Sequence, residues 1–148
     1  MSLKNQIQEE VKNAMRAREK ERLSVLRLVS AAIKQREVDE RIELDDEQVL
    51  LVLDKMLKQR RESLELFEKG AREDLAAQER YELEVIQAFM PEPLGEAELN
   101  DLIKAAIANS GASSLRDMGA VMNALRPNVQ GRADMKLVSQ AVKSQLGA

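Results

Sequence analysis

The stretch Val85-Ile86-Gln87-Ala88-Phe89-Met90-Pro91-Glu92-Pro93 divides the chain and decides how it can fold. Its first part carries apolar residues at helical spacing. A helix that arrives here must end before Pro91, because the residue preceding a proline avoids helical backbone angles. The sequence therefore predicts two domains, residues 1–90 and residues 91–148.

The composition on both sides of this boundary indicates an all-α fold. Ala, Leu, Glu, Lys, Arg and Gln dominate the 148 residues, and only 6 Gly and 3 Pro interrupt them. The dominant residues lose the least conformational freedom on entering a helix. Apolar residues make up 44% of the chain, which is enough to bury a core, and no stretch shows the sustained alternation of a strand.

Four helices are predicted in the N-terminal domain, where apolar residues recur at steps of three and four. They cover about residues 3–17, 19–38 and 72–89, with a third helix between Asp45 and Gly70. Asp45 or Asp46 is expected to cap that third helix by accepting hydrogen bonds from its free N–H groups. Gly70 is expected to end it in the left-handed conformation, which glycine adopts without strain.

Three shorter helices are predicted in the C-terminal domain. Two cover about residues 96–108 and 114–125, and a last one follows Asp134. Ser114 and Asp117 have the spacing of a capping box, and Asp134 is expected to cap the last helix. Residues 126–131 are predicted to form a turn. The architecture is thus a four-helix N-terminal domain followed by a three-helix C-terminal bundle.

Several kinds of chemistry are excluded by the residue inventory. The chain has no Cys and no His, so it lacks a thiolate nucleophile, a Cys-based zinc site and the commonest metal ligand and general base. Neither a Walker motif nor a G-x-G-x-x-G motif is present. We therefore predict no catalytic residue, no metal and no cofactor, with a Ser–Lys dyad as the one alternative left open.

Two charged clusters are interpreted as solvated helix faces. Glu79, Glu82 and Glu84 lie close together, but an acid and base pair needs a cleft that shifts a pKa. A basic run on the third predicted helix either faces a nucleic acid or pairs with Glu62 and Glu65, and the pairing is favoured. The run consists of Lys55, Lys58, Arg60 and Arg61.

The location of the protein is predicted from what the sequence lacks. The N-terminal residues MSLKNQIQEE have no apolar core like that of a signal peptide. No apolar run approaches the roughly 20 residues that a membrane span needs. A cytoplasmic protein without a membrane partner is expected.

Positive charge is concentrated near the C-terminal end, although the whole chain has a formal net charge of −3. Residues 103–148 contain only two acids, Asp117 and Asp134. They contain six bases, which are Lys104, Arg116, Arg126, Arg132, Lys136 and Lys143. This segment suits a polyanion, and the scarcity of aromatic side chains favours phosphate or shape contacts over base stacking. Arg132 also precedes a predicted helix N-terminus, which is receptive to phosphate.

The same segment carries a recognisable signature. The runs Asp117-Met118-Gly119-Ala120-Val121-Met122 and Gly131-Arg132-Ala133-Asp134-Met135-Lys136-Leu137-Val138 resemble the C-terminal signature of the GatB/YqeY family. Four N-terminal stretches and Met90-Pro91 look like those of free-standing YqeY-like proteins. These stretches are Arg22 to Leu28, Ala31 to Lys34, Lys58 to Ser63 and Arg72 to Leu75.

The resemblance implies a role near tRNA. In that family, the smaller helical domain also ends the B subunit of glutamyl/aspartyl-tRNA amidotransferase and is appended to some glutaminyl-tRNA synthetases, where it contacts tRNA. Gly119, Arg132 and Lys136 are the site positions that the resemblance suggests, and the charge pattern adds Arg126 and Lys143. Close packing between helices is the alternative role for Gly119. The sequence departs from the signature at Ala120, where relatives often have Lys, and at Met135, where Gly is common.

Three functions follow as hypotheses. The first is a non-catalytic tRNA-binding accessory protein, related to tRNA-dependent amidotransferases and aminoacyl-tRNA formation, with a synthetase or amidotransferase as a further partner. The second is a protein–protein adaptor that uses the N-terminal helical hairpin and has no nucleic-acid role. The third is a component of a glutamine-dependent carbon–nitrogen ligase, which only the family name suggests.

Overall fold

The computed structural model describes residues 1–147 and is helical throughout its regular elements. These residues form seven α-helices and one short 3₁₀ helix, and no strand occurs among them. The prediction of an all-α fold is confirmed. The chain divides into two compact units, Met1–Met90 and Pro91–Ala148, each with a hydrophobic core of its own.

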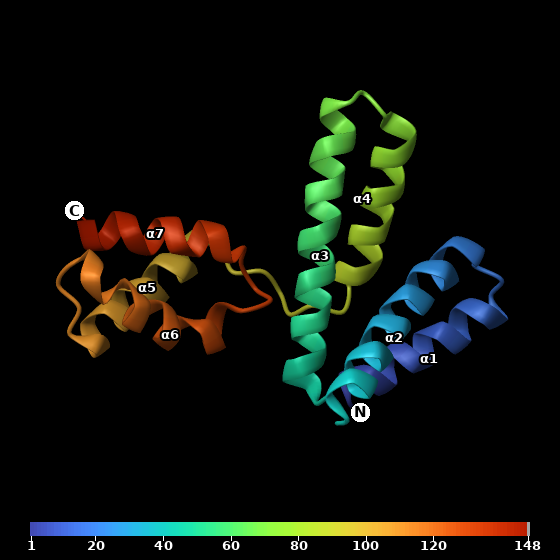
Figure 1. The fold of residues 1–148 in the computed structure, drawn as a ribbon, viewed down its shortest axis with the longest axis horizontal. Helices are drawn as coiled ribbons and strands as arrows, with labels where there is room; N and C mark the ends of the chain where they lie inside the picture. Colours follow the sequence, from blue (N-terminus) through green and yellow to red (C-terminus); the bar gives the residue numbers. More distant parts are fainter. Residues whose placement is uncertain (148) are drawn as a thin grey trace. The chain divides into compact units, whose positions relative to one another are not determined.

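The first unit is built from two helical hairpins (Figure 1). Its helices are α1 (Leu3–Arg16), α2 (Lys20–Glu40), α3 (Asp46–Lys69) and α4 (Glu73–Gln87). α1 packs against α2, and α3 packs against α4. Their apolar stripes meet in one core that includes Ile7, Leu26, Leu53, Leu57 and Ile86, all almost fully buried.

The starts of α1 and α3 are tied together by side-chain caps. The Ser2 hydroxyl accepts a hydrogen bond from the Asn5 N–H at 3.2 Å. Asp45 and Gln48 form a reciprocal capping box, as an N-cap carboxylate at this position predicts. Asp46 Oδ1 accepts a hydrogen bond from the Leu3 N–H at 2.8 Å, so one carboxylate in the first turn of α3 satisfies a free N–H of α1.

The end of α3 differs from the prediction by one residue. Gly70 is the C-cap, but its φ of −83° is open to any residue. The left-handed position is the next one, where Ala71 has a φ of 56°. The hydrogen-bonding pattern explains the left-handed conformation of Ala71. The Arg72 N–H donates to the Phe67 carbonyl oxygen at 2.9 Å, and this bond requires a left-handed residue just before Arg72.

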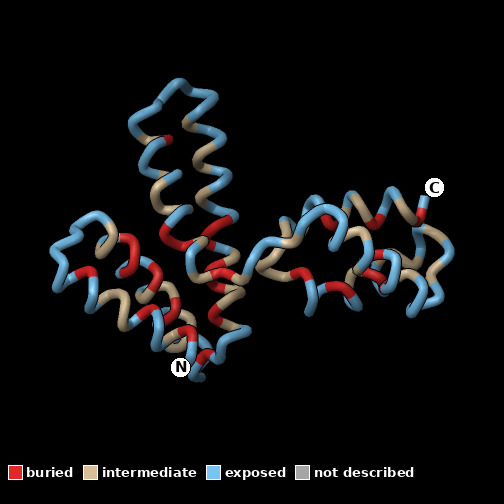
Figure 2. The backbone as a smooth tube through the Cα atoms, turned by 180° about the vertical axis from the view of Figure 1, so that it is seen from behind, coloured by how far each residue is buried: buried red, intermediate tan, exposed pale blue. Residues whose placement is uncertain are grey.

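The outer half of the α3–α4 hairpin has little apolar core. Figure 2 shows buried residues concentrated where the hairpin joins the other helices, with exposed and intermediate residues towards its tip. Arg80 of α4 forms two ion pairs in this outer half, one within its own helix with Glu73 at 2.6 Å and one across to Glu68 of α3 at 3.3 Å. Charged contacts therefore accompany a reduced apolar core along this part of the hairpin, where Ala76 is still buried.

The Glu79 and Glu82 side chains are not on a solvated face, and that prediction is wrong. Their side chains are only 14% and 12% exposed, because both turn towards Arg60 of α3. Arg60 Nε lies 2.8 Å from Glu82 Oε2 and 3.8 Å from Glu79 Oε2. Burial, followed by the nearby charge of Glu82, raises the pKa of Glu79.

The second unit is a smaller helical bundle. It contains α5 (Glu96–Ser110), the 3₁₀ helix η1 (Leu115–Asp117), α6 (Met118–Val129) and α7 (Met135–Gly147). Its core includes Ile103, Val121, Leu125, Val138 and Val142. The capping box of Ser114 and Asp117 is confirmed, and it starts η1 rather than an α-helix directly.

The predicted turn at residues 126–131 is wrong in its first part. α6 continues through Pro127 to Val129. A proline inside a helix lacks one hydrogen bond, which normally favours an end. Here Val129 is completely buried in the core of the unit, so its packing holds the last turn in place.

Candidate nucleic-acid interface

Two predicted site residues lie on one flank of α6. Gly119 and Arg126 are seven residues apart, which places them on one side of the helix about 10.5 Å apart along its axis. Both are exposed, and Asn123 lies between them on the same flank. Arg126 makes no ion pair with any residue that the structure describes. This flank is open to a partner from outside.

Gly119 is not a close-packing residue. A Cβ atom added at this position would meet nothing within 4 Å. The alternative of close approach between helices is therefore wrong. What the glycine provides instead is an exposed backbone near the start of α6, without a side chain to hold a partner away.

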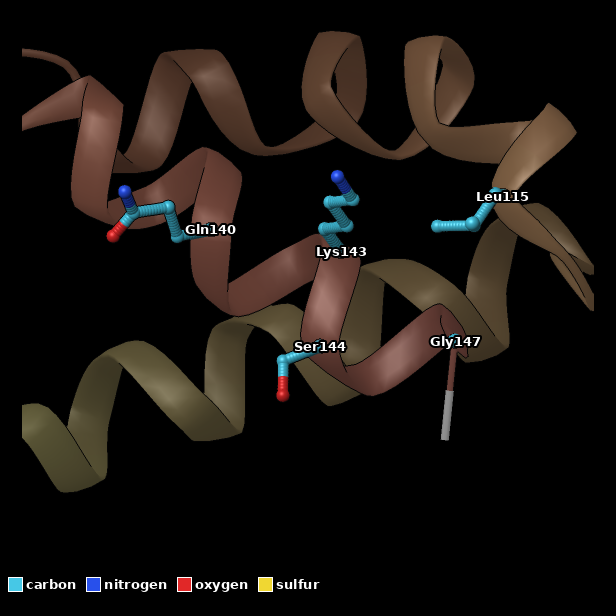
Figure 3. Close-up of a pocket in the computed structure, with 5 residues that line it drawn as sticks. All are labelled: Leu115, Gln140, Lys143, Ser144 and Gly147. Carbon is cyan, nitrogen blue, oxygen red and sulfur yellow. The ribbon is translucent and has the colours of Figure 1, made fainter.

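Two further predicted residues lie on one face of α7. Lys136 and Lys143 are exposed and also seven residues apart, with Gln140 between them. Lys143 borders a shallow groove of about 430 Å³ between α7 and η1. Figure 3 shows Leu115 of η1 extending towards this groove beside Lys143. A cation thus stands at the edge of a largely apolar depression.

Arg132 has a different position from the other four. Its Nε donates a hydrogen bond to the Glu92 carbonyl oxygen at 3.1 Å, and its guanidinium lies 3.9 Å from Glu98 Oε2. Its own carbonyl oxygen accepts a hydrogen bond from the Leu94 N–H at 2.8 Å. The residue therefore fastens the proline-containing segment to the α6–α7 loop.

The helix N-terminus after Arg132 is already occupied. Asp134 Oδ1 accepts a hydrogen bond from the Lys136 N–H at 3.0 Å. A carboxylate there satisfies the free N–H and opposes the positive end of the helix dipole. Asp134 thus caps the helix as predicted and occupies one N–H of this helix start, where a phosphate contact stays a prediction.

The net charge of the second unit is lower than the C-terminal segment alone suggests. Residues 91–148 contain six Lys and Arg and six Asp and Glu. Four of the acids precede residue 103, and they are Glu92, Glu96, Glu98 and Asp101. Acidic and basic residues are thus separated along the chain, and sequence reasoning on residues 103–148 missed the acidic part of the same unit.

The exposed bases of the second unit have few charged partners. Asp117 Oδ2 accepts hydrogen bonds from the N–H groups of Ser113 and Ser114, at 2.9 and 3.3 Å, and Asp134 caps α7. Both acids of residues 103–148 are thereby engaged with backbone groups. Within the described part of the chain, five of the six bases form no ion pair. They are Lys104, Arg116, Arg126, Lys136 and Lys143.

The basic run of α3 is divided between exposed and inward-facing cations: Lys55, Lys58 and Arg61 are exposed, whereas Arg60 turns towards α4. Arg60 is engaged with Glu82 and Glu79 of α4, not with the predicted partners Glu62 and Glu65 on its own helix. Glu65 pairs with Lys69 instead. The predicted pairing with Glu62 and Glu65 is therefore wrong for Arg60, whose acidic partners lie on α4.

No metal or membrane element emerges from the described residues. Across residues 1–147, the structure contains no cluster of three or more acidic side chains arranged to hold a metal ion. None of the helices within that range combines the length and apolar composition that crossing a bilayer requires.

The sequence is similar to fungal proteins whose names place them in mitochondria. Over 145 residues it is 30% identical to "Altered inheritance of mitochondria protein 41, mitochondrial" of Pyrenophora tritici-repentis, covering 96% of this chain and 80% of the relative. It is 35% identical over 94 residues to the protein of the same name from Eremothecium gossypii. That match covers 62% of this chain and about half, 51%, of the relative.

These names overturn the prediction of a cytoplasmic location. Four of the similar proteins carry the word mitochondrial in their names. The prediction depended on the lack of a secretory pattern, but mitochondrial transit peptides are amphipathic and rich in Arg rather than apolar. The absence of an apolar leader therefore does not indicate the cytoplasm.

The resemblance seen in the two C-terminal runs extends over nearly the whole chain. A family model described as "Yqey-like protein" matches residues 4–146, which include both compact units. The relative from Pyrenophora tritici-repentis also aligns with almost the full chain. The chain therefore belongs to the YqeY-like protein family.

Proposed function

We propose that the protein binds tRNA as an accessory factor and catalyses no reaction itself. Contact is made by the exposed bases of α6 and α7, with Arg126, Lys136 and Lys143 facing phosphate groups. The observation that carries this proposal is the engagement of Asp117 and Asp134 with backbone N–H groups. Because those acids are held by their caps, neighbouring bases are left for an external polyanion.

The spacing of the bases supports a phosphate backbone as the ligand. Lys136 and Lys143 stand about 10.5 Å apart along α7. Two cations at that separation suit a chain of phosphates better than one small anion. The shortage of aromatic residues also favours backbone and shape contacts over stacked bases. Gly119 contributes an unobstructed stretch of backbone on α6.

Arg132 has a positioning role in this proposal. Its guanidinium is engaged with Glu92 and Glu98. Charge reversal at Arg132 would disturb the loop before α7 and would confuse loss of binding with loss of structure. The variants that test the interface are therefore Lys136→Glu and Lys143→Glu, with Arg126→Glu as a separate third change.

The test is a filter-binding titration against total tRNA and a duplex DNA of matched length, at two salt concentrations. Preferential binding to tRNA is expected, with about a tenfold weaker affinity for Lys136→Glu/Lys143→Glu. The slope of log K against log salt should become shallower by about 2 when two phosphate contacts are lost. Equal binding to DNA, or an unchanged affinity in the double variant, would contradict the proposal.

The matched control carries two charge reversals on the first unit, Arg27→Glu and Lys34→Glu. These side chains are exposed and lie on α2, so the net charge changes by the same amount without touching α6 or α7. tRNA affinity should be retained in this control. A comparable loss in both double variants would indicate a non-specific response to net charge.

A further inference from the structure

The outward side of α2 carries a regular stripe of residues opposite the core. We call it the α2 basic stripe; it consists of Lys20, Ser24, Arg27, Ala31, Lys34 and Val38. All six residues are exposed, whereas Leu26, Val29 and Ile33 on the other side of the helix are buried. Cations alternate along it with small or apolar residues, and no acid lies on it.

The cations of this stripe differ from several cations of the same hairpin that have acidic partners. Lys4 pairs with Glu37 at 2.8 Å, Arg22 with Glu10 at 2.8 Å and Arg36 with Glu40 at 2.6 Å. Lys20, Arg27 and Lys34, in contrast, form no ion pair with another residue in the described range. The unit as a whole has a negative formal charge, with 17 Lys and Arg against 20 Asp and Glu. The stripe is thus positively charged although the net charge of the unit is negative.

The spacing of the stripe is that of a helix-packing seam. Its six positions follow one another at alternating steps of four and three, which is the heptad spacing of a coiled coil. Ser24 and Ala31 are small enough to let a second helix come close. The stripe runs from Lys20 to Val38, about 27 Å along the helix axis, which is long enough for a partner helix of several turns.

Apolar surface accompanies the charge. Leu28 is 44% exposed and Val38 is 63% exposed. Leu23 and Leu28 line a shallow groove of about 390 Å³ together with Lys20, Ser24 and Arg27. A phosphate backbone gains nothing from exposed leucine and valine, whereas an amphipathic helix buries apolar area against them. The mixture therefore favours a protein over a nucleic acid.

We propose that the α2 basic stripe docks an acidic amphipathic helix of a partner protein. Acidic side chains of that helix face Lys20, Arg27 and Lys34, and its apolar side chains pack on Leu28 and Val38. Charge complementarity selects the partner, because an acidic helix finds three unpaired cations and no competing acid on the seam. This interaction is separate from the proposed tRNA contact on α6 and α7.

The test uses a synthetic 21-residue peptide with Glu every seventh residue and Leu or Ala at the intervening seam positions, labelled with a fluorophore. Its affinity for the full protein is measured by anisotropy beside a scrambled peptide of the same composition. Binding should fall about tenfold in Arg27→Glu/Lys34→Glu, where repulsion replaces attraction. The Lys136→Glu/Lys143→Glu variant should bind the peptide as the unchanged protein does.

A second variant separates the apolar contribution from the charge. Leu28→Ser/Val38→Ser should weaken peptide binding several-fold while leaving tRNA binding unchanged. Circular dichroism and the unfolding midpoint establish that each variant is folded before its peptide and tRNA affinities are compared. Equal affinity for the scrambled peptide, or no loss in either stripe variant, overturns the proposal. Failure of the unchanged protein to bind the acidic peptide also overturns it.

Discussion

The Arg132 Nε atom donates a hydrogen bond to the Glu92 carbonyl oxygen at 3.1 Å, across 40 residues of sequence. A second hydrogen bond joins the same two segments, because the Leu94 N–H donates to the Arg132 carbonyl oxygen at 2.8 Å. A backbone bond and a side-chain bond thus hold the proline-containing segment against the loop before α7. Arg132 matches a position of the family signature, but its guanidinium makes contacts within the protein.

Replacing Arg132 with alanine should therefore lower stability more than binding. Loss of one charge-assisted hydrogen bond is expected to cost about 1 kcal/mol in the free energy of unfolding, while the distant contact with Glu98 adds little. Urea unfolding measures the first effect and tRNA filter binding the second. A strong loss of tRNA affinity without a change in stability would show that the guanidinium contacts RNA directly.

Gly119 offers a test of the open flank of α6. An added Cβ meets no neighbour, and alanine is the better helix former, so Gly119→Ala should stabilise the protein by about 0.5 to 1 kcal/mol. Gly119→Glu should instead weaken tRNA binding by repelling phosphate, without unfolding the protein. Thermal unfolding and filter binding distinguish the two effects. Destabilisation by Gly119→Ala would contradict the finding that an added Cβ has free space at this position.

Glu79 and Glu82 should respond in opposite directions to loss of charge. The pKa of Glu79 is raised, mainly by burial, so stability falls as the pH rises from 4.5 to that raised pKa and stays lower above it. Glu79→Gln should therefore raise the free energy of unfolding at pH 7, and the gain should vanish below the ordinary pKa of 4.5, where Glu79 is protonated. Glu82→Gln removes the carboxylate nearest to Arg60 and should cost about 1 to 2 kcal/mol.

Urea unfolding of both variants between pH 4 and pH 8 checks this pair of predictions. The two substitutions remove the same charge from neighbouring turns of α4, so each serves as the control for the other. Equal effects at every pH would mean that Arg60 does not distinguish the two carboxylates.

The end of α3 is strained at Ala71, which has a φ of 56°. A non-glycine residue in the left-handed region costs about 1 kcal/mol. Ala71→Gly should therefore raise the unfolding midpoint, since the relief exceeds the entropy that glycine adds to the unfolded chain. Gly70→Ala should have a smaller effect, because its φ is negative and the added Cβ lies 3.4 Å from the Leu66 carbonyl oxygen. A stabilisation at Gly70 but not at Ala71 would contradict this assignment.

The contact between Lys4 and Glu37 should make stability depend on pH at the acidic side. The hydrogen bond from Lys4, followed by that from the Leu44 N–H, lowers the pKa of Glu37 below 4.5. Its contribution is present above pH 4.5 and is lost as the pH falls through the lowered pKa. Glu37→Gln should flatten the dependence of the unfolding midpoint on pH between pH 5 and pH 3. Glu9→Gln, in the exposed pair with Lys12, is the control.

Much of the helical structure followed from local patterns. The capping residues Asp45, Ser114 and Asp134 were predicted from sequence, and each accepts the expected hydrogen bond within four residues of itself. The end of α4 before Pro91 also depends only on neighbouring residues. Helix caps and helix ends can be predicted from sequence because the interacting groups are close together in the chain.

The candidate site was only partly predictable. Charge and the family signature identified Arg126, Lys136 and Lys143 as exposed cations, but they also selected Arg132, whose partner lies 40 residues away. The α2 basic stripe was missed, although its regular spacing of Lys20, Arg27 and Lys34 was present in the sequence. Helical periodicity alone shows which residues share a side, but not which cations find an acid on a neighbouring helix.

The sequence by itself determined that the chain is helical, which capping residues stand at several of its helix starts, and that it offers no Cys or His chemistry. Tertiary structure decided that α6 passes through Pro127, because burial of Val129 outweighs the missing hydrogen bond. It also decided that Glu79 and Glu82 turn inward to Arg60 while Lys136 and Lys143 stay exposed. Local propensity acts over a few residues, whereas the partner of a charged side chain is set by packing between distant helices.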